Sequence, residues 1–176
     1  PEPDTNGWNL LLMGTVLQQT VRNYDNTHNK TTCPKATTVG RDEGTYQVTE
    51  KVEYLNRTSE EGVWMSFNST FQFYNESTRP YSLMNTTEKS GGPPASYRFL
   101  YVDGNCTVMQ LVFVNYSGSV LPRPGQGVLC GIWVKPEAIG SESPDCNSTF
   151  YQRCNNTGVY SVYSEEECNR TTEKPE

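Results

Sequence analysis

The sequence predicts an all-β protein that folds as a single domain into an antiparallel sandwich or barrel. Three observations predict this class. Several segments alternate apolar and polar residues, which is the period of a strand with one buried face. The segments are short, lie at intervals of roughly 8–12 residues, and are separated by turn-forming Gly, Pro and Asp. The chain also contains eleven Tyr, six Phe and three Trp in 176 residues, whereas disordered chains are poor in aromatic residues.

The elements can be assigned in chain order. The apolar N-terminal segment from Trp8 to Leu17 predicts a short helix that leads into the first strand. The alternation is clearest from Tyr46 to Tyr54, and it continues at 63–67, 71–74, 97–102, 107–114 and 128–134. Turn signals lie between these stretches at 41–44, 91–94, 103–104 and 122–125. The domain spans residues 1–176, and we expect its polar tails, about 1–6 and 169–176, to be loose.

A C-terminal α-helix is predicted after the last strand. Ser143 is a candidate N-cap, Pro144 takes the first helical position, and an acidic residue follows in the first turn. Cys146, Phe150 and Cys154 then lie at spacings of four residues on one helix face. We expect that face to flank the body of the domain and to carry two disulfides.

The sequence is rich in potential glycosylation sites. Ten of the fifteen asparagines head an Asn-x-Ser/Thr sequon, where chance would give about three. A used sequon requires a secreted chain and an Asn at the surface, so the pattern predicts a secreted, extracellular glycoprotein. The ten sites are Asn29, Asn56, Asn68, Asn75, Asn85, Asn105, Asn115, Asn147, Asn155 and Asn169.

The cysteine count agrees with secretion. Six cysteines are an even number, which in a secreted chain predicts three disulfides. A zinc site would need C-x-x-C or His-rich spacing, and the sequence has neither. No stretch reaches the roughly 18–20 apolar residues of a membrane span. The chain begins Pro1-Glu2-Pro3-Asp4, without an apolar leader, and we expect it to be the mature form.

Charge and chemistry argue against several classes of function. The net charge of −6 is scattered along the chain, whereas nucleic acids and anionic membranes select basic patches. The only histidine, His28, lies in a loop-like run of Asn, Asp and Thr, which does not support a Ser-His-Asp or Cys-His catalytic arrangement. We therefore expect a protein that is not an enzyme, with no catalytic residues, no metal and no cofactor.

The sequons also predict which strand residues face outward. If Asn68 carries a glycan, the residues of opposite parity on its strand face inward: Met65, Phe67, Phe71 and Phe73. Such a row fits either a filled core or the wall of a hydrophobic pocket. Asn115 conflicts with this scheme, because it shares parity with Phe113 and with other residues expected inside. Either that strand ends before Asn115, or its sequon is unused.

A series of motifs, most of them in the C-terminal third, carries a family resemblance. The series is Thr32-Cys33, Asn105-Cys106-Thr107-Val108, Cys130-Gly131-Ile132-Trp133-Val134, Pro144-Asp145-Cys146 with Phe150 and Cys154, and Val162-Tyr163 with Cys168. It resembles the salivary lipocalins of blood-feeding ticks, the family that includes the histamine-binding proteins. The detailed match covers roughly residues 97–168. Of the branches of that family, the Japanin-like immunomodulators are the nearest in kind.

The resemblance implies an eight-stranded antiparallel lipocalin barrel with a flanking helix. The interior of such a barrel is just wide enough for one small ligand, a size rule for which lipocalins are themselves the standard example. The resemblance also implies three disulfides, Cys33–Cys168, Cys106–Cys146 and Cys130–Cys154.

The expected ligand follows from what the barrel interior lacks. In the histamine-binding members, the resemblance implies interior acids that pair with the ligand's ammonium, and two of those positions hold Thr107 and Gly131 here. The side chains expected inside favour an uncharged, greasy ligand such as a sterol (for example cholesterol), a fatty acid or an eicosanoid. The expected ligand-binding residues are Tyr54, Phe67, Phe71, Phe73, Phe99, Tyr101, Thr107, Met109, Leu111 and Trp133, with Thr107, Tyr101 or Tyr54 giving one polar contact. Alternatively, these side chains simply fill the barrel and nothing binds.

The expected function is therefore binding of a small hydrophobic ligand, with suppression of the host's immune or inflammatory response by a protein of tick saliva. Two alternatives stay open. One is a biogenic-amine scavenger that binds histamine or serotonin through acids not yet placed inside. The other is a protein-binding module whose loops inhibit a host immune protein, such as a complement component, or a cell-surface receptor. A protein interface would have to use the stretches without sequons, 34–55, 88–104 and 118–146.

Overall fold

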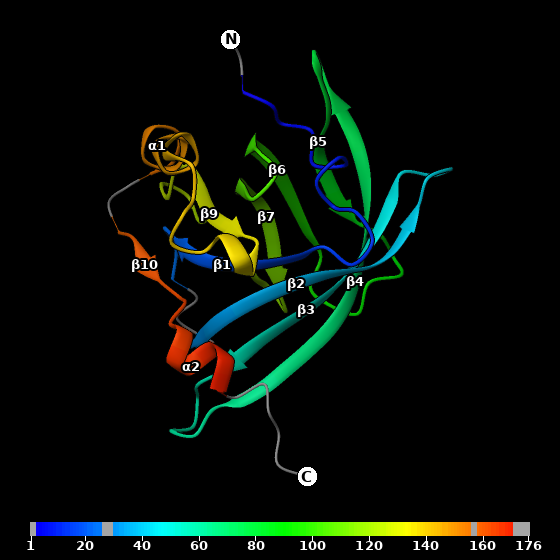
Figure 1. Cartoon of the computed structure of the whole chain (residues 1–176). Coiled ribbons are helices and arrows are strands. Elements are labelled where there is room, and N and C mark those ends of the chain that lie inside the picture. The colour runs from blue at the N-terminus through cyan, green and yellow to red at the C-terminus, as the bar shows by residue number, and fades with distance from the viewer. Residues whose placement is uncertain (1–2, 26–29, 156–157, 171–176) are drawn as a thin grey trace.

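The computed structural model describes residues 3–25, 30–155 and 158–170. Figure 1 shows its strands curving around a common interior, with α1 beside β9 and α2 at one end of β2. The strands are β1 (Val16–Arg22), β2 (Thr31–Asp42), β3 (Gln47–Asn56), β4 (Val63–Glu76), β5 (Arg79–Thr86), β6 (Ala95–Val102), β7 (Cys106–Tyr116), β8 (Ser119–Leu121), β9 (Leu129–Val134) and β10 (Tyr160–Ser161). The helices are a 3-10 turn (Pro136–Ala138), α1 (Pro144–Arg153) and α2 (Glu165–Arg170).

Eight of these strands close into a barrel. Strands β1 to β7 pair in chain order, each antiparallel to the next, and β9 pairs with both β7 and β1. Strands β8 and β10 are short additions that pair with the ends of β7 and β1. The expected eight-stranded antiparallel barrel with a C-terminal flanking helix is thus confirmed, and closure leaves its long strands without a free edge.

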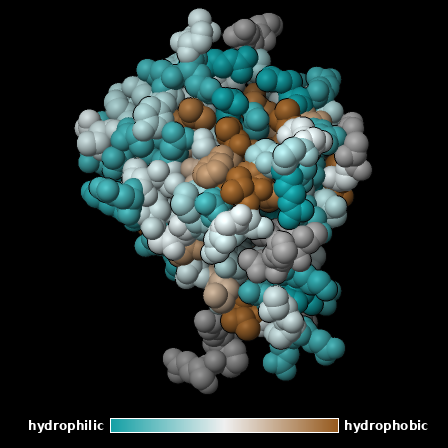
Figure 2. Space-filling model, turned by 180° about the vertical axis from the view of Figure 1, so that it is seen from behind, coloured by the Kyte–Doolittle hydropathy of each residue, from teal (hydrophilic) through white to brown (hydrophobic). Residues whose placement is uncertain are grey.

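Hydrophobic side chains on the inner strand faces fill one half of the barrel. Phe73 and Phe99 stack there with ring centroids 6.0 Å apart, which is an arrangement that stabilises aromatic pairs beyond their area of contact. The buried residues of this half are Trp8, Leu10, Leu11, Leu17, Val48, Phe71, Phe73, Met84, Phe99, Val102 and Met109. Figure 2 shows the outer surface from one side, where most residues are hydrophilic or neutral and the hydrophobic ones lie mainly in the upper and central part, with another near the lower end.

The short N-terminal helix expected over Trp8 to Leu17 is wrong. The N–H groups of Leu10 and Leu11 both donate to the Gly7 carbonyl, which makes one turn, and strand β1 already begins at Val16. The segment instead closes one end of the barrel. Arg41 holds it in place by donating to the carbonyls of Trp8 and Leu11, at 2.6 and 2.7 Å, while its guanidinium lies 3.6 Å from the Trp8 ring. The apolar residues of this segment are therefore explained by their burial in the barrel and not by a helix.

The tail expected to be loose at residues 1–6 is partly ordered. Thr5 is buried, and the Asp4 carbonyl accepts a hydrogen bond from the Val102 N–H at 2.8 Å. At the other end, residues 169–170 belong to α2. Residues 1–2 and 171–176 lie outside the described residues, so the structure does not test whether these parts of the tails are loose.

The C-terminal helix starts where the sequence predicts it. The Ser143 hydroxyl accepts a hydrogen bond from the Cys146 N–H at 3.2 Å, and Pro144 opens the helix. Cys146 and Phe150 are buried against the outer surface of β6, β7 and β9. The structure contains the three disulfides that the resemblance implies, Cys33–Cys168, Cys106–Cys146 and Cys130–Cys154.

Candidate functional site

The half of the barrel away from Trp8 contains a cavity of about 1020 Å³. Antiparallel strands bring together the carboxyl ends of β1, β3 and β7 and the amino ends of β2, β4 and β6, and these ends form its walls. The volume is comparable to that of the largest small-molecule sites, roughly 1,000 Å³. The lining residues are Gln19, Arg22, Tyr24, Thr31, Pro34, Val52, Tyr54, Ser66, Phe67, Gly91, Gly92, Pro93, Pro94, Tyr97, Asn115, Tyr116, Ser117, Ser119 and Trp133.

The deep wall of the cavity is largely apolar. Val52 on β3 lies opposite Phe67 on β4, and Trp133 on β9 lies opposite Gln19 on β1. Tyr97 connects this wall to the filled half of the barrel, because its ring makes an edge contact with Phe71 at 6.0 Å between centroids. The floor of the cavity is therefore the top of the packed core.

A buried arginine lies on the same wall nearer the mouth. The register of β1 against β9 shifts between Gln19 and Val21, and this irregularity lets both Gln19 and Arg22 face the cavity. Arg22 is 7% exposed. Its Nε donates to the Tyr24 carbonyl at 3.2 Å, and its Nη2 donates to the carbonyl and hydroxyl oxygens of Thr31 at 3.0 and 3.3 Å. The guanidinium also lies 5.5 Å from the Tyr24 ring centroid.

Four tyrosines, Tyr24, Tyr54, Tyr97 and Tyr116, line the same cavity as this arginine. Burial raises the pKa of Tyr97 well above its usual range, and Tyr116 and Tyr24 add to the shift. Burial likewise raises the pKa of Tyr116; Tyr24 and Tyr54 add to that shift, while the charge of Arg22 opposes it. Within the described residues no hydrogen bond engages the four hydroxyls, so they remain available as O–H donors. We call Arg22 and the hydroxyls of Tyr24, Tyr54, Tyr97 and Tyr116 the donor cluster.

A buried acid lies below the cavity. Glu50 is 3% exposed and lies on β3 between Thr38 and Ser69, its direct partners on β2 and β4. Within the described chain, Glu50 Oε2 and the hydroxyls of Thr38 and Ser69 have no hydrogen-bond partner. Burial raises the pKa of Glu50 to about 7, and the facing Thr38 opposes the shift. Glu50 shares its strand face with Val52 but does not itself line the cavity.

The structure divides the ten sequence-predicted site residues into distinct groups. Tyr54, Phe67 and Trp133 line the cavity. Phe71, Phe73, Phe99 and Met109 lie in the packed half of the barrel. Thr107 is fully buried, with its hydroxyl donating to the Tyr101 carbonyl at 2.7 Å, and Leu111 lies in a buried cluster against which Tyr97 and Tyr116 pack. The row of aromatic residues on β4 is thus filled core at Phe71 and Phe73 and cavity wall at Phe67, so each of the two alternatives holds in one half of the barrel.

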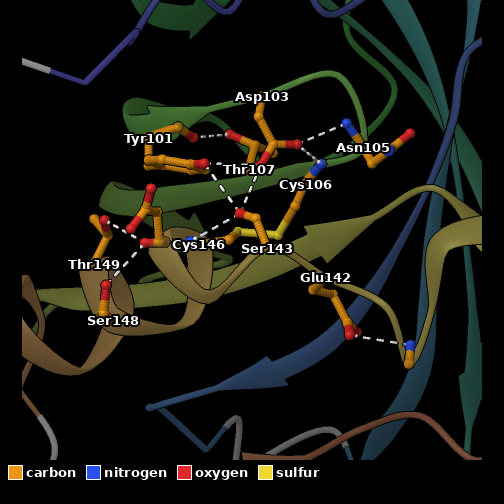
Figure 3. The surroundings of a disulfide bond; sticks show 12 residues. Tyr101, Asp103, Asn105, Cys106, Thr107, Glu142, Ser143, Cys146, Ser148 and Thr149 are labelled. Carbon is orange, nitrogen blue, oxygen red and sulfur yellow. Dashed lines mark hydrogen bonds between the residues drawn. A yellow bond between two sulfur atoms is a disulfide. The ribbon is translucent and has the colours of Figure 1, made fainter.

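The expected inward orientation of Tyr101 is wrong. The register of β6 against β7 shifts between Phe99 and Tyr101, which turns Tyr101 to the outer face. Its hydroxyl bonds to Asp103 at 2.9 Å and to Ser143 at 3.0 Å, at the start of α1 (Figure 3). Tyr101 therefore supports the helix cap beside the Cys106–Cys146 disulfide.

A second register shift explains the conflict over Asn115. It lies between Ser96 and Tyr97 on β6, opposite the stretch of β7 that ends at Phe113. Beyond it Phe113 is 37% exposed and Val114 is 1% exposed, so the parity of β7 has reversed. Met65, also expected inside, is 42% exposed near the start of β4, where it pairs with Tyr54. Asn115 is partly exposed, and its Oδ1 accepts from the Gly118 N–H at 2.7 Å.

The two positions where the resemblance implies acids are occupied differently here. The backbone of Gly131 is covered by the Gln19 side chain, since a Cβ at Gly131 would lie 2.2 Å from Gln19 Nε2. Thr107 is buried, as described above. Neither site offers room or charge for a cation, and among the described residues no Asp or Glu lines the cavity.

Sequence reasoning missed most of the polar lining. Gln19, Arg22 and Tyr24 lie in or just after β1, a strand that was expected to follow Leu17 but whose inward residues were not predicted. Tyr97 had a usable signal, because it shares parity with the inward Phe99. Tyr116 had no such signal, because the register shift on β7 reverses which residues face inward before the strand reaches it.

The sequons lie where glycans could be attached. Asn68, Asn75, Asn105, Asn147 and Asn169 are exposed, and Asn56, Asn85, Asn115 and Asn155 are partly exposed. Asn29 and His28 lie outside the described residues. The stretches without sequons touch one another: Ser143 bonds to Tyr101 and Asp103, and Lys35 shares a small cavity of about 220 Å³ with Pro136 and Ile139.

The described residues lack the features of a metal site and of a helix that spans a bilayer. They contain no group of three or more His, Cys, Asp or Glu side chains placed to hold a metal ion. They also contain no helix of the length and hydropathy that a bilayer span requires.

Comparison with known proteins places this fold among relatives. The sequence profile of the family described as "Tick histamine binding protein" matches residues 13–170. A search of curated proteins finds no match. Among solved structures, Japanin from Rhipicephalus appendiculatus, described as bound to cholesterol, is similar with a TM-score of 0.62 and 14% identity, covering 89% of this chain and 97% of that chain. At that identity the likeness concerns the fold alone.

Proposed function

Because the chain belongs to the tick histamine-binding protein family, we propose that it is a secreted, glycosylated lipocalin that binds one small hydrophobic ligand in its barrel cavity. A sterol, a fatty acid or an eicosanoid would fit that description. Capture of the ligand would modulate the host's immune or inflammatory response. The protein would act by binding and not by catalysis.

The cavity is the observation that carries this proposal. It measures about 1020 Å³, and Val52, Phe67 and Trp133 give it an apolar deep wall. Burial of apolar ligand surface there is favourable by roughly 25 cal/mol per Å² before the costs of association. Secretion is supported by the pairing of all six cysteines in disulfides. Japanin, the similar fold described as bound to cholesterol, supports the ligand class.

The first test is to identify what the cavity takes up. The chain would be produced in eukaryotic cells, purified and denatured, and its organic extract analysed by mass spectrometry. A lipid or sterol at about one molecule per protein supports the proposal. An empty extract, followed by no uptake of cholesterol or of a fluorescent fatty acid by the purified protein, would refute it.

Substitution of Val52 by Trp is expected to weaken ligand binding at least about tenfold. The larger ring would occupy space beside Phe67 that the ligand needs, and overpacking of this kind costs about 1–3 kcal/mol. The matched control is Lys51→Trp, one residue away on the outer, exposed face of the same strand. Fluorescence titration with a hydrophobic probe measures both variants. Equal binding by the two would mean that the ligand lies outside the cavity.

Amine scavenging is the second candidate, and Glu50 is the observation that favours it. A carboxylate with an unsatisfied oxygen near the cavity floor is what an ammonium group would seek. An amine that reached Glu50 would hold it ionised and lower its pKa from about 7. Isothermal titration with histamine and serotonin at pH 8 tests this function. It requires binding by the wild type and a loss of at least about thirtyfold in Glu50→Gln, and it is abandoned if neither amine binds.

A further inference from the structure

We propose that the ligand of this cavity is a lipid acid whose carboxylate is bound by Arg22 and the surrounding tyrosine hydroxyls. The inference rests on the proposed function, and it narrows the ligand from any hydrophobic molecule to one class. That class is an amphipathic molecule with an acidic head and an apolar tail.

The first step is the charge of Arg22. Buried charges in proteins are normally paired, because taking an ion out of water without a partner is costly. Arg22 is 7% exposed, yet within the described chain its guanidinium makes no ion pair. Its three hydrogen bonds all end on neutral oxygens of Tyr24 and Thr31. One full positive charge therefore faces the cavity without a counter-charge.

The second step is the supply of donors. Three of the five N–H groups of a guanidinium are used in those bonds, and no hydrogen bond of the described residues engages Nη1. The hydroxyls of the four neighbouring tyrosines are neutral donors as well. A carboxylate has two oxygens that together accept up to about four hydrogen bonds, and its charge matches that of Arg22. A sterol hydroxyl would leave the charge of Arg22 unpaired, and an ammonium group would be repelled by it.

The third step is the direction of the cavity. Along β1, Arg22 lies nearer the mouth than Gln19, whose strand partner is Trp133 on the deep wall. Val52 and Phe67 complete the apolar wall at that depth. An acid bound head-outward would thus place its carboxylate at the donor cluster and its hydrocarbon tail against Val52, Phe67 and Trp133. The lining thus changes from charged at Arg22 to apolar at Val52, Phe67 and Trp133.

The test compares two ligands that share one tail, one with a charged head and one with a neutral head. The fluorescent lipid cis-parinaric acid and its methyl ester have the same tail, and each would be titrated into the wild-type protein at pH 8. The acid is expected to bind at least about tenfold more tightly than the ester, because charge-assisted hydrogen bonds are roughly twice as strong as neutral ones.

Variants then test which side chains cause the tighter binding of the acid. Arg22→Gln is expected to bring the affinity for the acid to that for the ester, with the ester changed less than about twofold. Arg123→Gln is the matched control, since it removes one positive charge from an exposed arginine away from the cavity. Tyr116→Phe removes a hydroxyl from the donor cluster while keeping the ring. It is expected to weaken binding of the acid several-fold and to leave binding of the ester unchanged. Because this variant keeps the packing, it stays informative if Arg22→Gln does not fold.

The outcomes separate the inference from the proposed function. Equal affinity of the wild type for acid and ester, or an equal loss of both in Arg22→Gln and in Tyr116→Phe, overturns the role of the donor cluster while the cavity remains a lipid site. If the wild type binds neither the acid, the ester nor cholesterol, both the inference and the proposed function are wrong.

Discussion

Replacement of Cys33 and Cys168 by alanine is expected to lower the free energy of unfolding by about 5 kcal/mol. The disulfide joins residues 135 positions apart, from the start of β2 to α2. Chain-entropy arguments give a penalty that grows with the logarithm of the closed loop, and this loop contains most of the chain. A loss of this size is a third or more of the stability of an ordinary domain, about 5–15 kcal/mol. Guanidinium unfolding followed by tryptophan fluorescence measures it.

The Cys130–Cys154 pair provides the control. It closes a loop with a sequence separation of only 24, and its cysteines are as buried as those of the longer pair. Its replacement by two alanines removes the same atoms and is expected to cost about 3–4 kcal/mol by the same entropy relation. An equal cost for the two pairs, or a larger cost for the short loop, would show that local packing outweighs loop closure in this barrel.

Glu50→Gln is expected to stabilise the protein at pH 9 and to remove much of its pH dependence between pH 5 and 9. The pKa of Glu50 is raised from 4.5 to about 7 by burial, so in that interval the folded chain holds a proton that the unfolded chain has released. The stability contributed by the protonated side chain is full below pH 4.5 and is lost as the pH rises through 7. The loss between pH 5 and 9 is about 2–3 kcal/mol.

Thermal unfolding at the two pH values checks this prediction. For a chain of this size the change corresponds to a difference of roughly 5–10 °C in Tm between wild type and Glu50→Gln at pH 9. Glu53→Gln is the control on the same strand, since its carboxylate is half-exposed and forms only a long pair with Lys35 at 3.9 Å. A wild type whose stability is flat from pH 5 to 9, or a Glu53 variant that shifts as much as the Glu50 variant, would contradict the assignment.

The buried acid and the buried arginine bear on different ligands. Arg22 lines the cavity and makes no ion pair within the described chain, whereas Glu50 lies below the lining and, with a pKa raised to about 7, is only partly ionised near neutral pH. A lipid acid needs Arg22 and is indifferent to Glu50. An amine needs Glu50 and is repelled by Arg22. Binding measured in the Arg22→Gln and Glu50→Gln variants therefore separates the two functions with the same set of proteins.

Local patterns predicted a large part of the fold. The alternation from Tyr46 to Tyr54 begins one residue before β3 and otherwise lies within it, and the Ser143-Pro144 signal starts α1. These patterns succeed because alternation and capping depend on residues that are close in sequence. The resemblance added the strand count and the family, and both are confirmed. The identity of the cavity-facing residues was predicted less well, with Tyr54, Phe67 and Trp133 on the cavity wall.

The sequence by itself determined the class of the protein: an all-β domain with a flanking helix, six cysteines and many sequons, which its family resemblance narrowed to a barrel. Only the tertiary structure decided which side chains face the cavity. Register shifts on β1, β6 and β7 reverse the inside and outside of single residues, so that Arg22 faces the cavity and Tyr101 faces α1. Such shifts arise where a curved sheet closes on itself, which depends on strands far apart in sequence. A cavity is likewise the space that packed elements leave between them, and no local pattern specifies its shape or charge.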